Sequence, residues 1–310
     1  MPVKFTKMHG LGNDYVLVSL FEQHVDDPPG LARAISDRHR GVGSDGLILL
    51  APPDSPEADA RMIMFNSDGS RAQMCGNGIR CLAKLAWERG LVRRNPMRIA
   101  TDAGVLSIDL TLDSAGKATQ ARVDMGAPIL QPGRIPVRLA GERVVAAPLA
   151  VGTRSLLVTC VSMGNPHAVF FTDRLEDVPL ADWGPRIERH ALFPEKTNVH
   201  FAHVLARGRV RMITWERGAG LTQACGTGAC AVGVAAVLNN LTDRMLTVHL
   251  PGGDLQVEWV AAEPVRGGAG SPANPAATAG PGQALAPPER SNHVFMTGPA
   301  EEVFTGDWPD

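Results

Sequence analysis

The sequence predicts an α+β, or mixed α/β, protein from three observations: many short strand patterns, few helical patterns and an internal repeat. The chain has 310 residues, of which 44% are hydrophobic and 20% are charged. A chain of this size can bury a substantial core, and a prior of roughly 100 to 200 residues per domain suggests two domains. Strands that outnumber helices are typical of the α+β class.

Apolar alternation rich in β-branched residues predicts nine short strands. They cover residues 14–19, 46–50, 60–65, 105–112, 155–161, 167–171, 198–205, 209–215 and 255–260. Helical patterns are fewer: they cover residues 30–38, 76–88 and 226–238. Gly90 follows the second helix as a stop signal.

Residues 264–288 predict no secondary structure. Of these 25 residues, 18 are Pro, Gly or Ala, and almost none is a large apolar residue. Such a composition cannot bury enough apolar surface to offset the entropy of ordering. We expect a disordered surface insertion between two ordered pieces, with a docking tail as the alternative interpretation.

Charge and composition exclude several classes of protein. The chain carries 30 Lys and Arg against 32 Asp and Glu, without a long basic block, which argues against a nucleic acid partner. The longest apolar runs, such as 229–238, are too short to span a bilayer, so we expect no membrane partner. The first ten residues lack the apolar core of a secretory signal, which predicts a cytoplasmic location.

The chain resembles itself at a separation near 150 residues. Aligning Cys75 with Cys225 brings further residues into register: Phe65 with Trp215, Gln73 with Gln223, Gly76 with Gly226 and Gly78 with Gly228. The segment 12–15 (GNDY) then meets 164–167 (GNPH), and a third match relates 104–108 to 253–257. Because the matches fall in loops, where function collects, we expect two similar halves facing each other across a pseudo-twofold axis and sharing one site.

Cys75 and Cys225 each stand immediately before a predicted helix. The first-turn amides of a helix lack intrahelical partners and carry the positive end of its dipole. A thiolate is favoured there, because the ordinary thiol pKa of about 8.5 falls at helix N-termini. The neighbouring glycines let backbone N–H groups approach an anion closely. The two motifs therefore predict two reactive thiols around one carboxylate site.

An odd number of cysteines does not suggest a disulfide framework, and Cys81, Cys160 and Cys230 are interpreted as small buried hydrophobes. A zinc site would need four close ligands in spacings such as C-x₂-C, which neither reactive-thiol motif offers, so no metal is predicted. A redox disulfide between Cys75 and Cys225 is an alternative, although no C-x-x-C is present.

Acid–base chemistry fits the two thiols better. A thiolate on one face of a carbon removes its proton while a thiol on the opposite face delivers another, which inverts the configuration. That step requires no cofactor. Charge would develop on the adjacent carboxylate, and two helix N-termini aimed at it would stabilise that charge.

Seven stretches carry a family resemblance. They are HGLGNDYV at 9–16, RHRGVGSDG at 38–46, FNSDGSRAQMCGNGIRC at 65–81, MGNPHAV at 163–169, TNVHF at 197–201, WERGAGLTQACGTGAC at 215–230 and HVFMTGPAEEVFTG at 293–306. On these motifs the chain closely resembles the diaminopimelate epimerase family. The likeness covers nearly the whole chain in order, apart from 264–288.

The resemblance implies interconversion of LL- and meso-2,6-diaminopimelate, without pyridoxal phosphate or metal, in the lysine and cell-wall precursor pathway of bacteria. It implies two pseudo-symmetric domains, each with strands wrapped about a central helix and with the site in the cleft between them. We expect residues 1–125 with 298–310 to form one domain and 126–297, including the insertion, the other. It also implies a homodimer.

Residue roles follow from the same resemblance. Cys75 and Cys225 would be the base and the acid, exchanging roles with the direction of reaction. The reacting carboxylate would be held by the backbone at Gly76, Asn77, Gly226 and Thr227. The distal amino-acid end would be held by Asn13, Asn66, Asn165, Asn198, Glu216 and Arg217.

The chemistry of these side chains suits a zwitterion, because Arg217 can bind a carboxylate in bidentate fashion and oxygen acceptors can bind an ammonium. His167 and Glu216 would tune the thiols. Gly46 replaces a polar substrate contact of some family members, and no role follows for it.

Two other functions stay open. A proline-type racemase or phenazine-pathway-like isomerase would share the fold; the former also uses two cysteines, whereas the latter lacks them. Arg217 discriminates, because a substrate with one amino-acid end does not need it. A non-enzymatic amino-acid-binding or thiol-sensing protein is the other alternative, in which Cys75 and Cys225 would pair reversibly.

Overall fold

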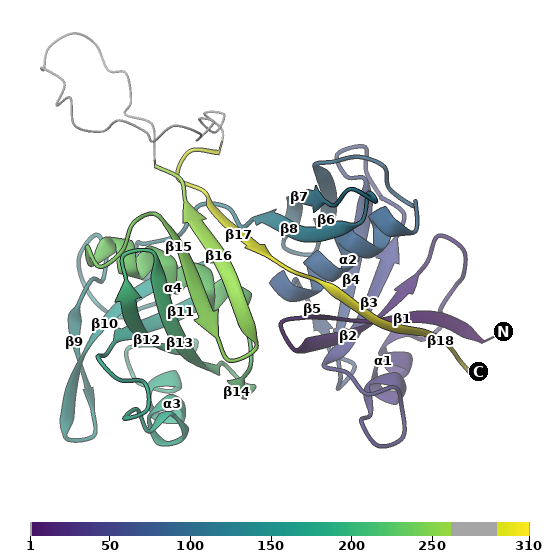
Figure 1. The fold of residues 1–310 in the computed structure, drawn as a ribbon. Helices are drawn as coiled ribbons and strands as arrows, with labels where there is room; N and C mark the ends of the chain where they lie inside the picture. The colour runs from purple at the N-terminus through teal and green to yellow at the C-terminus, as the bar shows by residue number, and fades with distance from the viewer. Residues whose placement is uncertain (1, 262–289, 310) are drawn as a thin grey trace, which may run out of the picture.

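Two helices, α2 (Gly76–Glu88) and α4 (Gly226–Leu238), each lie inside a wrapping of strands in the computed structural model of the protein (Figure 1). The structure describes residues 2–261 and 290–309, so the predicted insertion at 264–288 lies outside the described residues. Both helices begin and end where the sequence predicts. Most residues of each are buried, because α2 packs on strands of one half and α4 on strands of the other.

The first half contains eight strands and one further helix. The strands are β1 (Val3–Gly10), β2 (Asn13–Ser19), β3 (Gly46–Ala51), β4 (Ala60–Asn66), β5 (Arg71–Ala72), β6 (Met97–Thr101), β7 (Gly104–Leu112) and β8 (Ala118–Asp124). The helix α1 (Pro28–Ser36) starts two residues before its predicted position, because Asp27 caps it by accepting from the Gly30 amide at 2.9 Å.

The second half repeats this plan. Its elements are η1 (Pro132–Arg134), β9 (Ala147–Val151), β10 (Arg154–Ser162), β11 (Pro166–Phe171), α3 (Leu180–Glu188), β12 (Asn198–Ala206), β13 (Arg209–Glu216), β14 (Gly220–Thr222), β15 (Met245–Leu250) and β16 (Gly253–Trp259). The chain ends with β17 (Val294–Gly298) and β18 (Glu301–Trp308).

Strand pairing confirms the internal repeat and the predicted fold class. In the first half β2 pairs parallel to β3, β3 antiparallel to β4, β4 parallel to β6 and β6 antiparallel to β7. In the second half β11, β12, β13, β15 and β16 repeat these four pairings in the same order. The pairing therefore relates the two halves element by element.

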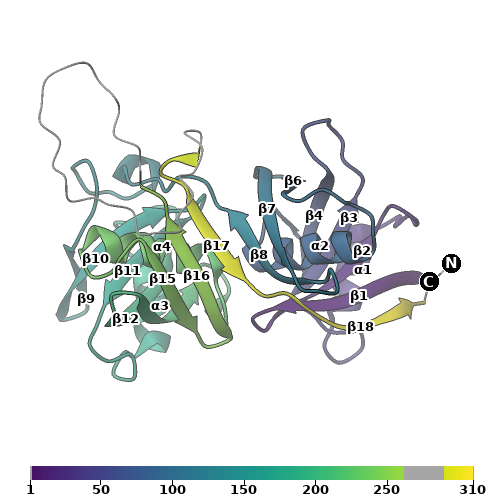
Figure 2. The ribbon, with the colours of Figure 1, turned by 45° about the horizontal axis from the view of Figure 1, so that its top comes forward.

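The halves are joined through β8 and β17, which pair antiparallel to each other. The strand β17 also pairs with β16, and the chain then continues into β18, which returns to pair with β1 (Figure 2). The predicted domain boundary after residue 125 falls just beyond β8, and that before residue 298 falls inside β17. As a division into domains these boundaries stay a prediction.

All nine predicted strands are present with ends within two residues of those expected. Helix α3 is absent from the prediction because Gly184 and Pro185 interrupt its pattern. Gly184 is required there, since a Cβ at that position would lie 2.6 Å from the Trp215 ring. Nine further strands were not predicted; they are β1, β5, β6, β8, β9, β14, β15, β17 and β18.

One apolar core runs through both halves. It includes Ile79 and Leu82 of α2, Val232 of α4 and Met296 of β17. Among the described residues, no helix combines the length and the apolar character needed to cross a membrane.

Candidate active site

The N-termini of α2 and α4 face each other directly. A Cβ added at Gly76 would lie 3.8 Å from the Cα of Gly226, and one added at Gly226 would lie 3.7 Å from the Cα of Gly76. Met296 packs against both positions, with side-chain atoms 3.0 Å from each added Cβ. The amide-rich mouths of the two helices therefore open onto one place, and Cys75 and Cys225 are their N-cap residues.

Cys75 lies in a network of polar groups. Its Sγ lies 3.1 Å from the Tyr15 hydroxyl and 3.6 Å from Asn13 Oδ1, and it accepts from the Gly78 amide at 3.5 Å. Burial raises the pKa of the Cys75 thiol, and the hydrogen bonds from Tyr15 and the backbone of Gly78 and Asn77 offset this only in part.

Cys225 is buried more deeply, at 4% exposure. Its Sγ lies 3.7 Å from the Thr227 hydroxyl. Burial and the negative charge of Glu216 raise the pKa of the Cys225 thiol well above its ordinary value. The expectation of a lowered thiol pKa is therefore wrong for both cysteines. Helix-terminal amides do lower it, but loss of solvation outweighs them.

Glu216 lies at the end of β13 and interacts with the Cys225 thiol. Thr222 donates its hydroxyl to Glu216 Oε1 at 2.6 Å, which fixes the carboxyl group. Burial raises the pKa of Glu216. Its charge also acts on Cys75, so one carboxyl group influences both thiols.

Two asparagines occupy repeat-related loops. The turn at Leu11 and Gly12, with φ of 58° and 80°, joins β1 to β2 and places Asn13 beside Cys75. Asn13 Oδ1 accepts from the Tyr15 hydroxyl at 2.8 Å. In the second half Asn165 Oδ1 lies 2.8 Å from His167 Nε2, which is the equivalent contact.

Asn77 connects the halves. Its Nδ2 donates to Asn13 Oδ1 at 3.2 Å and to the Ala224 carbonyl at 3.5 Å. Arg80, which is fully buried, donates to Asn77 Oδ1 at 3.0 Å. A Cβ at Gly10 would lie 2.9 Å from the Arg80 guanidinium, so that glycine makes room for it.

Asn198 and Arg217 lie together. The Arg217 amide donates to Asn198 Oδ1 at 3.0 Å, and Asn198 Nδ2 donates to the Pro166 carbonyl at 2.9 Å. The Arg217 side chain is exposed, and its Nη1 donates to the Glu195 carbonyl at 3.1 Å. That bond uses one of the five N–H donors of a guanidinium, and the others suit a carboxylate.

Asn66 is held apart from this network. Its Nδ2 donates to the Ser70 hydroxyl at 2.9 Å, and no hydrogen bond within the described residues joins it to another predicted site residue. Gly46 pairs with Asn66 in the sheet, and a Cβ there would lie 2.3 Å from the Phe65 carbonyl oxygen. Backbone packing therefore accounts for Gly46.

His167 belongs to a buried chain of side chains. Its Nδ1 lies 2.8 Å from His200 Nε2, and His200 Nδ1 lies 3.0 Å from the Thr214 hydroxyl. Burial lowers the pKa of His167 well below its ordinary value and that of His200 to about 3, so both rings stay neutral. Within the described residues, hydrogen bonds join His167 to Asn165 and His200 rather than to a cysteine.

Tyr15, His200 and Thr222 are not among the residues predicted from sequence. The repeat could have indicated Tyr15, because it aligns with His167.

All five cysteines are free, and burial raises the pKa of Cys81, Cys160 and Cys230 to about 12. Those three are buried, as predicted. Among the described residues, no cluster of three or more His, Cys, Asp or Glu side chains could hold a metal ion.

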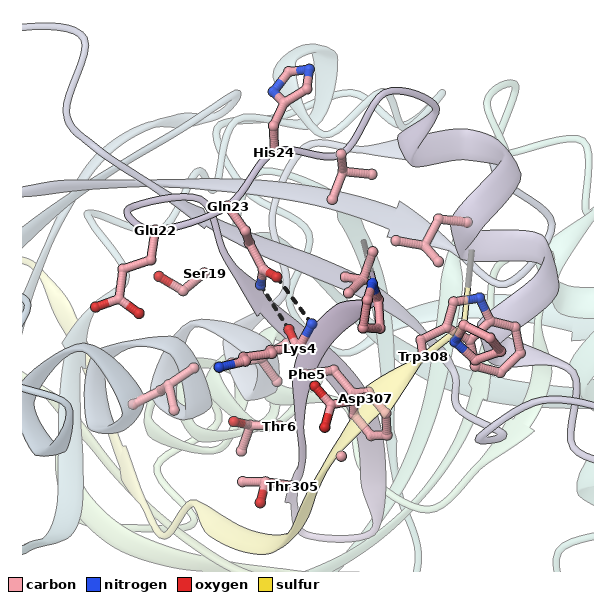
Figure 3. A pocket seen from close by; sticks show the side chains of 18 of the residues that line it. Lys4, Phe5, Thr6, Ser19, Glu22, Gln23, His24, Thr305, Asp307 and Trp308 are labelled. Carbon is pink, nitrogen blue, oxygen red and sulfur yellow. Dashed lines mark hydrogen bonds between the residues drawn. The ribbon is translucent and has the colours of Figure 1, made fainter.

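A cavity of about 1180 Å³ lies away from the cysteines, between β1, β18 and the segment after β2 (Figure 3). Lys4, Gln23, His24 and Trp308 are among its lining residues, and Gln23 is tied to Lys4 by two hydrogen bonds. None of the predicted site residues lines it. This cavity therefore does not contain the predicted chemistry.

Comparisons with known proteins agree with the predicted fold and family. The sequence profile of diaminopimelate epimerase matches residues 5–131 and 159–273. A relative named diaminopimelate epimerase, from Acetivibrio thermocellus, is 47% identical over 305 residues, which cover 98% of each chain.

Two solved structures share the fold. A probable proline racemase from Agrobacterium radiobacter superposes with a TM-score of 0.65 at 16% identity, covering 98% of this chain and 92% of that one. A phenazine biosynthesis protein of the PhzF family from Bacillus anthracis gives 0.64 at 15% identity and covers both chains completely.

The protein is thus an isomerase of the epimerase class, built from two repeated halves. The extent of the profile match and the 47% identity to a relative over 98% of both chains also show the family. The chain belongs to the diaminopimelate epimerase family.

Proposed function

We propose that this protein interconverts LL- and meso-2,6-diaminopimelate by inverting one carbon between two cysteines. The observation that carries the proposal is the close approach of Gly76 and Gly226, which brings two cysteine-capped helix N-termini to one place. Four backbone amides, at Gly76, Asn77, Gly226 and Thr227, would hold the carboxylate of the reacting carbon.

The chemical step needs one thiolate and one thiol. The thiolate takes the proton from the α-carbon, and the electron pair of that C–H bond delocalises towards the carboxylate. The opposite thiol then donates its proton to the other face of the carbon. At the end the two sulfur atoms have exchanged protonation states, and the helix N-termini have stabilised the intermediate charge.

The raised thiol pKa values support this use of Cys75 and Cys225. The proton beside a carboxylate is very weakly acidic, so a strong base is needed to remove it. Burial makes each thiolate a stronger base than a solvated one, because less solvation stabilises its charge. The charge of Glu216 adds to this effect at both sulfur atoms. His167 would tune the thiols indirectly, through its contact with Asn165.

The distal amino-acid end of the substrate would be bound by Arg217 and by the other polar side chains predicted for the site. The exposed guanidinium of Arg217 suits the distal carboxylate. Oxygen acceptors suit the ammonium group; we assign them to Asn13, Asn66, Asn165, Asn198 and Glu216.

The test is solvent exchange at the inverted carbon. LL-diaminopimelate incubated with the enzyme in deuterated water should acquire deuterium there, as followed by ¹H NMR. Cys75→Ala and Cys225→Ala should each lower turnover by at least about 10³-fold, the scale of losing an essential group. Cys160→Ala, a buried cysteine in another core cluster, is the matched control. Near-normal turnover in either site variant would remove the two-cysteine mechanism.

We further propose a cytoplasmic homodimer that supplies lysine and peptidoglycan precursors without pyridoxal phosphate. The exposed apolar side chains Val303 and Phe304 on β18 support self-association, since they leave apolar area accessible on both faces of this strand. Light scattering on the eluting peak of a sizing column should give a molar mass twice the 32.9 kDa of one chain. The Phe304→Lys variant should give the molar mass of a single chain. A wild-type mass of a single chain would contradict the dimer.

A further inference from the structure

Tyr15 is buried, at 3% exposure, directly beside Cys75. Its hydroxyl lies 3.1 Å from Cys75 Sγ and 2.8 Å from Asn13 Oδ1. We propose that Tyr15 is a positioning residue for Cys75, whose hydroxyl donates to the thiolate and accepts from the thiol. The inference rests on the proposed function of Cys75 as a proton carrier.

The hydrogen bonds around Asn13 let the Tyr15 hydroxyl donate either to Asn13 or to Cys75. Asn13 Nδ2 donates to Asp45 Oδ2 at 2.6 Å, which turns Oδ1 towards Tyr15. When Cys75 is protonated, its S–H donates to the Tyr15 oxygen, and the Tyr15 O–H donates to Asn13 Oδ1. When Cys75 is ionised, the O–H rotates to the sulfur, and Asn13 Oδ1 keeps its bond from Asn77 at 3.2 Å.

No proton passes between Tyr15 and Cys75 in this scheme. Burial and the nearby charges of Cys75 and Asp45 raise the pKa of Tyr15 well above its ordinary value, so the phenol stays protonated. The charged or titratable groups acting on the pair are Asp45, Glu216, Arg80 and Cys81. Of the interactions that lower the pKa of Cys75, the hydrogen bond with Tyr15 has the greatest effect.

The second half lacks this contact. His167 stands at the repeat position of Tyr15 and keeps the equivalent 2.8 Å contact to its asparagine. Its other ring nitrogen faces His200, at 2.8 Å, and the hydroxyl nearest to Cys225 Sγ is that of Thr227, at 3.7 Å. The tyrosine hydroxyl therefore favours the ionised form of Cys75 over that of Cys225 in the resting enzyme.

Tyr15→Phe removes only the hydroxyl. In a Cys225→Ala background, the rate of iodoacetamide alkylation of Cys75 against pH, followed by peptide mass spectrometry, gives the Cys75 pKa directly. Tyr15→Phe should raise that pKa by about 1 to 2, the scale of one hydrogen bond to a charged acceptor. In a Cys75→Ala background it should leave the pKa of Cys225 unchanged. An unchanged Cys75 pKa would overturn the proposal.

A second measurement needs no substitution at Tyr15. It is the only tyrosine in the chain, so ¹³Cζ-tyrosine labelling gives one NMR signal. That signal should shift with the same pH midpoint as Cys75 alkylation and should lose this step in Cys75→Ala. A signal that does not move while Cys75 ionises would also overturn the proposal. Neither readout depends on turnover, so failure of diaminopimelate exchange is detected separately.

Discussion

The side-chain amide of Asn77 donates to the carbonyl of Ala224 at 3.5 Å, across 147 residues of sequence. Asn77 lies in the first turn of α2, and Ala224 immediately precedes Cys225. The bond therefore joins the helix of one cysteine to the loop of the other. Arg80 fixes the orientation of this amide by donating to its oxygen, so a buried cation supports the contact between the halves.

Loss of Arg80 should destabilise the protein strongly. Arg80→Met leaves the Pro299 carbonyl and the Asn77 amide oxygen without their side-chain donor, and the Gly76 carbonyl loses the second of its two donors. We expect the free energy of unfolding to fall by about 3 kcal/mol, the scale of unsatisfied buried acceptors. Urea denaturation measures it, and Arg134→Met, at an exposed arginine, should change it little. An equal effect of the two substitutions would contradict the prediction.

A side chain at Gly76 should damage activity more than folding. The added Cβ of Gly76→Ala would meet the flexible end of Met296 at 3.0 Å, which can move at a cost of about 1 kcal/mol. The same methyl group would stand between the two helix N-termini, where the carboxylate is expected, so turnover should fall by at least about 100-fold. Gly133→Ala is the control, because nothing lies within 4 Å of its added Cβ. Thermal melts and the deuterium assay together decide the outcome.

Glu216→Gln should lower the pKa of the Cys225 thiol. The negative charge of Glu216 raises that pKa, and the amide removes the charge while keeping an acceptor for Thr222. The pH dependence of Cys225 alkylation in a Cys75→Ala background should therefore move to lower pH. The absence of a shift would show that burial without Glu216 sets the pKa of the Cys225 thiol, and a shift to higher pH would show that Glu216 lowers that pKa; either result contradicts the prediction.

Glu216 should also change how the free energy of unfolding depends on pH. Its pKa is raised in the folded protein, so the folded state binds this proton more tightly than the unfolded state does. At low pH Glu216 therefore does not lower the free energy of unfolding. Its unfavourable contribution develops as pH rises from the ordinary pKa of 4.5 through the raised pKa of the folded state. Glu216→Gln should be more stable than wild type at pH 8 and show no such advantage at pH 4. Urea denaturation at both pH values measures this.

Acidification should destabilise the protein through the buried histidines. Burial lowers the pKa of His200 from 6.5 to about 3, so the unfolded state binds protons that the folded state excludes. The associated stability is complete above about pH 6.5 and is lost as pH falls towards 3. His200→Gln should show a slope of stability against pH, between pH 6 and 4, that is smaller by about one proton. An unchanged slope would mean that His200 titrates alike in both states.

Arg217→Met should separate the proposed substrate from a smaller one. Because the side chain is exposed, stability should stay within about 0.5 kcal/mol of wild type. Diaminopimelate turnover should fall by at least about 100-fold through loss of a charge-assisted pair. Arg209→Met, also exposed, is the matched control. Any racemisation of proline should be unaffected, and an equal loss on both substrates would place Arg217 elsewhere in the mechanism.

Local sequence signals predicted the elements whose ends are set locally. The bounds of α2 and α4 follow from a cysteine cap and an apolar run, and both match the structure. Helix α3 could not be predicted from its pattern, because Gly184 and Pro185 interrupt it, and Gly184 is needed only because it packs against Trp215. Strands such as β17 depend on partners distant in sequence.

The sequence by itself determined the duplication, the family and the two cysteines that begin equivalent helices, since those features rest on residue order and on hydrogen bonds a few residues apart. Only the tertiary structure decided that both thiol pKa values rise, that Gly76 meets Gly226 and that Tyr15 contacts Cys75. The physical reason is that solvation and close packing at a site are set by everything that surrounds it, and most of what surrounds these sulfur atoms comes from distant segments of the chain.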